Sequence, residues 1–282
     1  MSTVPRMSST AVHDVHMAIN LVHRLVYFVP ESNEEFTALG AGGASGYFAS
    51  RSAPMGAVSD DVVIATFYNF SPLAVRSAMP GVWDVATPSQ WQEARFRAVG
   101  RALDRVDAQL PKEAIDEARA LIDPVVANVD IGGKPLAAGN AAVALPDDPM
   151  LALFQQITVL REWRGDAHIA VLVANQVGPC DCLVWQVGTG RFPLRIAQMT
   201  RRWADDEWAA AEDRLRSHGW LDADGAVTPA GVDERERLES ETDRLCEPLW
   251  EPIGDEGARR LTELITPIHD AMQAAGTYGA LS

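Results

Sequence analysis

Basic side chains are scarce in this sequence. Its 282 residues contain 24 lysines and arginines against 39 aspartates and glutamates, which gives a formal net charge of −15 at pH 7. A surface of this sign repels phosphate backbones and anionic membranes unless a local basic patch forms. The composition therefore argues against a membrane-surface protein, and it leaves a local patch as the route to nucleic-acid binding.

Cysteine is scarce as well. The three residues Cys180, Cys182 and Cys246 are an odd number, and the first two are too close within an expected helix to form a disulfide easily. We expect reduced, packed thiols, with a redox or metal role as the less favoured alternative. The short apolar stretch near the N-terminus is interrupted by histidines, Asp14 and Arg24, and no small-residue cleavage site follows. We therefore expect a cytoplasmic protein.

The sequence also lacks the common catalytic and cofactor motifs. It contains no G-x-S-x-G elbow, no Walker loop and no H-E-x-x-H pair. The glycine-rich stretch GAGGASG fails as a dinucleotide-binding loop, because Ser45 stands where the third glycine is needed and a predicted helix precedes it. Asp166 and His168 are two residues apart and diverge on a helix, so a metal site is not favoured. We expect neither cofactor nor metal.

What the sequence does contain is helical periodicity. Apolar residues recur at helical spacing over residues 13–28, and further helices are expected from Pro88 and from Pro111, where proline suits the first turn. Residues 131–148 are rich in Gly, Ala and Pro and have little periodicity. We therefore predict a mainly α protein with a helical N-terminal domain over residues 1–130, a linker over 131–148 and a second domain over 149–282.

Residues 203–221, WADDEWAAAEDRLRSHGWL, followed by DADGAVTPAG, resemble the reading helix and wing of a MarR-type winged helix-turn-helix domain. The motifs VHRLVYFVPE, GYFASRSAPMG, ATFYNFSP and LREWRGDAHIAVL extend the resemblance over nearly the whole chain, to actinobacterial proteins of MarR-like type. This resemblance implies a helical N-terminal half and a MarR-like winged helix-turn-helix half with a small β wing. It implies no reaction.

MarR-type proteins dimerise through their terminal helices. The apolar face formed near the C-terminus by Leu261, Leu264, Ile265 and Ile268 suits a homodimer, and it equally suits packing on the N-terminal half of the same chain.

The expected reading helix is acidic. It begins with Asp205, Asp206 and Glu207, which the helix dipole favours but which oppose contact with phosphates. The expected wing contains no basic residue. The best basic patch lies upstream of the helix, in Arg191, Arg195, Arg201 and Arg202. We therefore expect DNA binding to be lost, with this basic segment as the open alternative.

Polar residues within apolar segments are the candidate site residues. His16, Asn20, His23 and Tyr27 fall on one face of the first helix, which must face either water or a polar cavity. In REWRGDAH we expect Gly165 to break the helix and Asp166 to cap the next one. The predicted catalytic residues are His23, Asp166 and His168. The predicted ligand-binding residues are Tyr27, Tyr47, Arg51, Tyr68, Asn69, Arg161 and Arg164.

These side chains suit a small-molecule pocket between the two halves of the chain. Histidine can exchange protons near neutral pH, and arginine forks can hold an anionic or carbonyl-bearing ligand. We interpret the chain as a winged-helix-derived protein of specialised metabolism that binds a small organic molecule. Transformation of that molecule would use non-redox acid–base chemistry, as in a lyase, isomerase, cyclase or hydrolase. The alternatives are a MarR-like, ligand-responsive DNA-binding regulator and a partner-binding protein that docks through its acidic helices.

Overall fold

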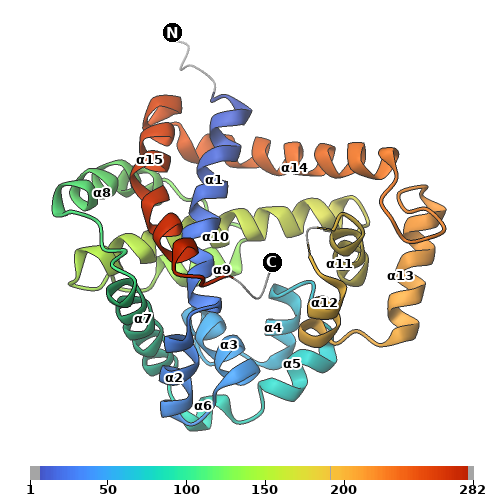
Figure 1. Cartoon of the computed structure of the whole chain (residues 1–282), viewed down its shortest axis with the longest axis horizontal. Helices are drawn as coiled ribbons and strands as arrows, with labels where there is room; N and C mark the ends of the chain where they lie inside the picture. Colours follow the sequence, from blue (N-terminus) through green and yellow to red (C-terminus); the bar gives the residue numbers. More distant parts are fainter. Residues whose placement is uncertain (1–6, 191, 279–282) are drawn as a thin grey trace.

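The computed structural model describes residues 7–190 and 192–278, which are mainly helical. The long helix α10, Pro149–Ala174, runs through the middle of the molecule (Figure 1). The side chain of Asp148 caps it by accepting hydrogen bonds from the amides of Met150 and Leu151. Because other elements pack on all its sides, α10 buries residues around its whole circumference.

Helix α10 continues without a break through Gly165. The predicted helix break at Gly165 and the predicted capping of a following helix by Asp166 are therefore wrong. Glycine inside a helix costs about 1 kcal/mol relative to alanine, and the packing of α10 on every side outweighs this amount.

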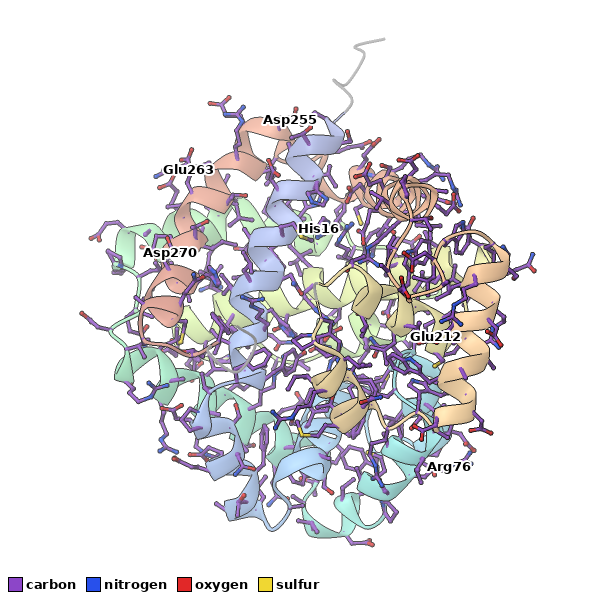
Figure 2. All side chains as sticks on the ribbon, turned by 45° about the vertical axis from the view of Figure 1, so that its right-hand side comes forward. His16, Arg76, Glu212, Asp255, Glu263 and Asp270 are labelled. Carbon is purple, nitrogen blue, oxygen red and sulfur yellow. The ribbon has the colours of Figure 1, made fainter. Side chains whose placement is uncertain are left out.

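The first hydrophobic core surrounds one half of α10. Its helices are α1, Ser9–His23; α8, Lys112–Ala127; α14, Pro229–Trp250; and α15, Gly254–Ala274. Helices α1 and α15 lie side by side, and the outer side of α15 carries Glu263 and Asp270 (Figure 2). The predicted apolar face of α15 is buried in this core, in Leu261, Leu264, Ile265 and Ile268. A homodimer would therefore have to use another surface.

The second core lies below the first in Figure 1 and is built from α7, Pro88–Arg105, and several shorter helices. The shorter ones are α2, Pro30–Leu39; α3, Gly43–Ser52; η2, Ala53–Met55; α4, Asp60–Thr66; α5, Pro72–Ala78; and α6, Val82–Val85. The 3₁₀ helix η1, Arg24–Tyr27, belongs to the first core through Leu25 and Val26. Helix α2 ends at Gly40, whose φ of 113° is the left-handed conformation that glycine adopts readily. Helix α7 starts at Pro88 as predicted, behind a capping box of Thr87 and Gln90.

The segment predicted as a linker contains helix α9, Pro135–Ala141. This helix packs against α10 and η2, with Leu136 buried in the second core and Ala137 in the first. The division of the chain into residues 1–130 and 149–282 stays a prediction.

The third core carries the region that resembles a winged helix. It comprises α11, Pro179–Gly188, and α13, Asp205–Ser217, together with parts of α10 and α14, and the short helix α12, Leu194–Arg201, joins them. Helix α13, predicted from its sequence, stands at one edge of the molecule (Figure 1).

The predicted β wing is not formed by the residues that the structure describes. Between α13 and α14 there is one antiparallel bridge, Leu221 to Val227, and no strand. The side chain of Asp222 accepts hydrogen bonds from the amides of Asp224 and Ala226, which closes a tight turn. Thr228 already caps α14, so the segment is too short for a longer ladder.

The cysteines are free and buried in this structure. Burial raises the pKa of Cys180, Cys182 and Cys246 to about 12, so the thiols stay protonated at neutral pH. They are packed core residues, as predicted.

Across residues 7–190 and 192–278, no single helix is both long and apolar enough to cross a membrane. Helices α10 and α11 reach the required length and composition only as a pair, and the two are bent by 102°.

Candidate functional site

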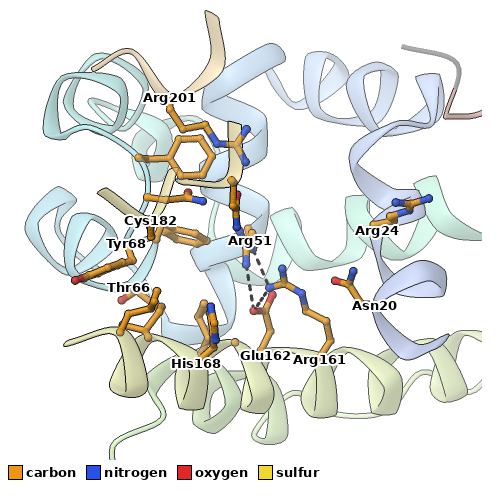
Figure 3. Close-up of a pocket in the computed structure, with 18 of the residues that line it drawn as sticks. Asn20, Arg24, Arg51, Thr66, Tyr68, Arg161, Glu162, His168, Cys182 and Arg201 are labelled. Carbon is orange, nitrogen blue, oxygen red and sulfur yellow. Dashed lines mark hydrogen bonds and ion pairs between the residues drawn. The ribbon is translucent and has the colours of Figure 1, made fainter. Parts of the chain in front are cut away.

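A cavity of about 330 Å³ lies where the three cores meet, and we call it the small cavity (Figure 3). Its walls come from α1, η1 and α3, from residues 66–70, and from α10, α11, α12 and α14. The volume is at the lower end of the range of pockets that hold small organic molecules. Seven of the ten predicted site residues line it, namely Tyr27, Tyr47, Arg51, Tyr68, Asn69, Arg161 and His168.

The centre of the small cavity's wall is Glu162, which is not among the predicted site residues. Its carboxylate, 1% exposed, accepts two hydrogen bonds from Arg51, at 3.3 and 3.2 Å, and one from Arg161 at 2.6 Å. Burial opposes the charge of Glu162, but the guanidinium groups of Arg161 and Arg51 outweigh burial and hold its pKa far below the usual range. The sequence does contain a signal for Glu162, because it is an acidic residue between Arg161 and Arg164 in an otherwise apolar segment.

Positive charge exceeds negative charge around Glu162. Arg95 on α7 is 4% exposed, and its guanidinium lies 5.8 Å from the ring centre of Phe154. Its Nη2 atom has no hydrogen-bond partner in the part of the chain that the structure describes. Burial lowers the pKa of Arg95, while the charge of Glu162 favours its protonated form. One carboxylate therefore faces three buried or partly buried guanidinium groups, those of Arg51, Arg95 and Arg161.

His23 lies directly behind the wall of the small cavity and is fully buried. The hydroxyl of Thr158 donates to the Phe154 carbonyl at 2.9 Å, so its oxygen accepts from Nδ1 of His23 at 3.2 Å. Nε2 of His23 is then the acceptor for the hydroxyl of Tyr27 at 2.7 Å. Tyr27 lines the cavity, and it connects His23 to the cavity interior.

The resting His23–Tyr27 pair is uncharged. Burial, followed by the charge of Arg161, lowers the pKa of His23 well below 6.5, and burial raises the pKa of Tyr27. Glu162 Oε1 lies 3.8 Å from Nε2 of His23, where it would stabilise an imidazolium cation. The geometry allows Tyr27 to take a proton from the cavity side while its own proton passes to His23.

His168 lines the same cavity from α10. Its Nδ1 atom is hydrogen-bonded at 2.9 Å to the hydroxyl of Thr242, which donates to the Leu238 carbonyl. Burial lowers the pKa of His168, so the ring is neutral near pH 7. It can therefore offer a neutral imidazole to a ligand.

Arg164 and Asp166 lie outside the lining of the small cavity. Arg164 ties α10 to α14 through Asp243 at 2.6 Å and Glu239 at 2.8 Å. Asp166 accepts a hydrogen bond from the Ala137 amide at 3.0 Å and so caps helix α9. Each residue of a helix is rotated by about 100° from the one before it, so Arg164 and Asp166 point to opposite sides of Gly165, which lines the cavity together with Arg161 and His168.

Asp166 gives a prediction about pH. Burial raises its pKa to about 6 from the ordinary 3.8. Between pH 3.8 and about pH 6, the folded protein keeps a proton on Asp166 that the unfolded chain has already released. The contribution of Asp166 to the free energy of unfolding is therefore fully present below pH 3.8 and is lost as the pH rises through about 6. Asp166→Asn keeps an oxygen acceptor for Ala137 but cannot ionise. Relative to wild type, we expect this variant to gain about 3 kcal/mol of unfolding free energy between pH 4 and pH 7.

Urea denaturation at several pH values measures this difference. The matched control is Asp84→Asn, a substitution at an exposed position that is expected to change stability by less than about 0.5 kcal/mol. A difference between Asp166→Asn and wild type that stays constant with pH would contradict the assignment of a proton to Asp166.

The described arginines of the predicted basic patch differ in their surroundings. Arg201 lines the small cavity, with its guanidinium 4.4 Å from the ring centre of Phe70. The guanidinium of Arg202 donates to the hydroxyl of Ser77 at 2.6 Å. Arg195 is exposed, and Arg191 lies outside the described residues.

Helix α13 presents an acidic face to solvent. Asp205, Asp206 and Glu207 are exposed in its first turn. Of its arginines, Arg214 forms a two-pronged contact with Asp181, and Arg216 pairs with carboxylates of α13 itself. Both basic side chains of the expected reading helix are therefore engaged within the protein.

No group of three or more His, Cys, Asp or Glu side chains is placed to hold a metal ion within residues 7–190 and 192–278. The comparisons with curated proteins and with solved structures found no match. Residues 12–279 match the sequence profile described as a helix-turn-helix family, a span that includes the cavity, α12 and α13. On this match over nearly its whole length, the chain belongs to that helix-turn-helix family.

Proposed function

We propose that this protein binds a small organic molecule in the small cavity and exchanges protons with it, and that its MarR-like helix-turn-helix framework no longer reads DNA. The observation that carries the proposal is the arrangement of buried arginines around one carboxylate, beside a hydrogen-bonded His23–Tyr27 pair that reaches the cavity.

The charge of the wall indicates the chemistry of the ligand. Guanidinium groups removed from water are stable only when anionic or strongly polar oxygens face them. Glu162 supplies two such oxygens for Arg51 and Arg161, and Arg201 has no carboxylate partner among the described residues. A ligand carboxylate or carbonyl oxygen would meet this demand, and the fork of an arginine matches a carboxylate in shape.

The proton chemistry follows from the two rings. As a proton leaves a ligand carbon or oxygen for the hydroxyl oxygen of Tyr27, the Tyr27 proton moves to Nε2 of His23. The electron pair stays on the ligand as an enolate or alkoxide, beside Arg51 and Arg161. The imidazolium formed on His23 faces Glu162, 3.8 Å away. Both new charges therefore lie beside groups of opposite sign.

Phenylpyruvate, a carbonyl acid with exchangeable protons, tests the proposal. We expect the protein to accelerate deuterium uptake at its methylene carbon, measured by proton NMR in D₂O. Tyr27→Phe should slow the catalysed exchange by about 10²-fold with little change in phenylpyruvate binding, because only the proton carrier is removed.

The matched control is Tyr68→Phe. Tyr68 also lines the small cavity, but its hydroxyl donates to the Val177 carbonyl at 2.7 Å, away from His23. We expect this variant to keep the exchange rate within about threefold, since no proton relay is lost. Equal rates for wild type and Tyr27→Phe, or phenylpyruvate binding without any exchange, would contradict proton transfer at Tyr27.

A ligand-responsive DNA-binding regulator is the second candidate, and the family match favours it. Against it stand the exposed carboxylates of α13 and the internal pairing of its two arginines. Fluorescence anisotropy with random duplexes of about 30 base pairs at low salt decides between the candidates. Binding tighter than roughly 10⁻⁶ M would support the regulator, since basic DNA-binding proteins reach this range without sequence specificity.

A further inference from the structure

A second and larger cavity, of about 1020 Å³, adjoins the small cavity. We call it the large cavity. It is bounded by α3, α5 and α12, by the chain around η1, and by residues that follow α15. The two cavities share six lining residues: Asn20, Arg24, Tyr27, Tyr47, Phe70 and Arg201. A single molecule could therefore extend from one into the other.

The walls of the two cavities differ in character. The small cavity contains the buried charges, Arg51, Arg161 and Glu162. The large cavity adds mostly apolar side chains from separate parts of the chain, namely Phe28, Phe48, Ala74, Phe192, Ile196 and Met199, together with the polar Thr200, Arg202 and Gln273. This combination of an apolar compartment and a cationic one matches a molecule with an apolar body and a polar end.

Arg201 lies at the boundary and has hydrogen-bonding capacity left over. Its guanidinium stands between the rings of Phe70 and Phe192, at 4.4 and 4.9 Å, and Nη1 donates to the Thr200 hydroxyl at 2.8 Å. Its buried Nε atom has no partner, and no carboxylate among the described residues forms an ion pair with it. Figure 3 shows Arg201 on the opposite side of the small cavity from Arg161 and Glu162.

The position of Arg201 is fixed by its backbone. The carbonyl of Arg201 accepts a hydrogen bond from the Ser71 amide at 3.0 Å, and the carbonyl of Arg202 accepts one from the Ser71 hydroxyl at 2.8 Å. These contacts join the end of α12 to the start of α5. The guanidinium itself is held by the hydroxyl of Thr200 and by the rings of Phe70 and Phe192. A guanidinium whose backbone and side chain are both held is ordered before a ligand arrives, which favours tight binding of an anion.

We infer that the two cavities together bind one amphipathic organic anion, whose acidic group is held by Arg201 at the boundary and whose apolar body occupies the large cavity. The inference rests on the proposed function and narrows its ligand to this chemical class. Neutral amphiphiles of the same shape would leave the Arg201 guanidinium without a counter-charge in a partly dehydrated site.

Decanoate and 1-decanol, which share an apolar chain and differ in charge, test the acidic group. We expect the full chain to bind decanoate at least about tenfold more tightly than decanol, measured by tryptophan fluorescence. Arg201→Gln should weaken decanoate binding by about tenfold to a hundredfold and change decanol binding by less than about twofold. Arg195→Gln, an exposed arginine on the same helix that lines neither cavity, should change neither.

A second series tests the apolar body. From hexanoate to dodecanoate, affinity should rise about two- to fourfold per added methylene, because each methylene leaves water for the large cavity. Ile196→Ser should reduce this increment while leaving hexanoate binding nearly unchanged.

Three outcomes would overturn the inference. They are equal affinities for decanoate and decanol, loss of both together in Arg201→Gln, and affinity that does not depend on chain length. Binding of phenylpyruvate without binding of decanoate would also overturn it, and that result would leave the proposed function of the small cavity standing.

Discussion

Replacing Glu162 by glutamine is expected to lower the free energy of unfolding by about 3–5 kcal/mol. The substitution preserves the shape of the side chain but removes the one negative charge that Arg51 and Arg161 contact within residues 7–190 and 192–278. Arg95, buried and without a carboxylate partner among the described residues, would then add to an uncompensated positive cluster. The loss of stability is large because arginine stays protonated even when it is shielded from water, so the positive charges remain without a counter-charge.

Urea denaturation at neutral pH measures the effect, and Glu117→Gln serves as its control. Glu117 also makes a two-pronged contact with an arginine, Arg260, but both side chains are about half exposed. Breaking that surface pair should change stability by less than about 1 kcal/mol. If Glu117→Gln and Glu162→Gln lowered the free energy of unfolding by similar amounts, burial would not be the reason why Glu162 stabilises the arginines around it.

The stabilisation by Glu162 should persist in acid. Its pKa in the folded protein is held far below the ordinary value of 4.5, so the stability that it contributes is present above pH 4.5 and is lost only as the pH falls through the lower folded pKa. The stability difference between wild type and Glu162→Gln should accordingly still be large near pH 4.

Replacing Gly165 by leucine is expected to weaken phenylpyruvate binding by about a hundredfold or more while the protein stays folded. Gly165 lines the small cavity, and a Cβ atom there would lie 3.6 Å from Nη1 of Arg161 and 3.7 Å from Oε2 of Glu162, at ordinary contact distance. The rest of a leucine side chain would occupy the cavity itself. Leucine also favours the helix over glycine, which offsets part of any local strain.

Two alanine variants separate helix propensity from cavity filling. Gly165→Ala and Gly100→Ala should each stabilise the protein by up to about 1 kcal/mol. Gly100 lies on α7 outside both cavities, and a Cβ there would meet only Leu151, at 3.8 Å. Thermal unfolding and phenylpyruvate titration of the three variants give the comparison. Unchanged binding in Gly165→Leu would mean that the small cavity is not where the molecule binds.

The sequence by itself determined the local structure of this protein. Helical periodicity and the proline at the start of the helix from Pro88 predict helices that the structure contains, including the one over residues 205–217. Capping, proline geometry and apolar spacing act between neighbours in the chain, so they can be recognised without knowing the fold. The same reading of the sequence found seven of the polar residues that line the small cavity, among them Tyr27, Arg51 and His168.

Only the tertiary structure decided how these elements are used. It holds α10 straight through Gly165, assigns Asp166 to the cap of α9, and makes Glu162 the counter-charge of the buried arginines. It also directs Arg201 from the predicted basic patch into the cavity. Each of these outcomes depends on groups that are distant in the sequence. Burial sets the free energy of a charged side chain, and packing can outweigh the local preference of a residue such as Gly165. Both arise only when the three cores assemble.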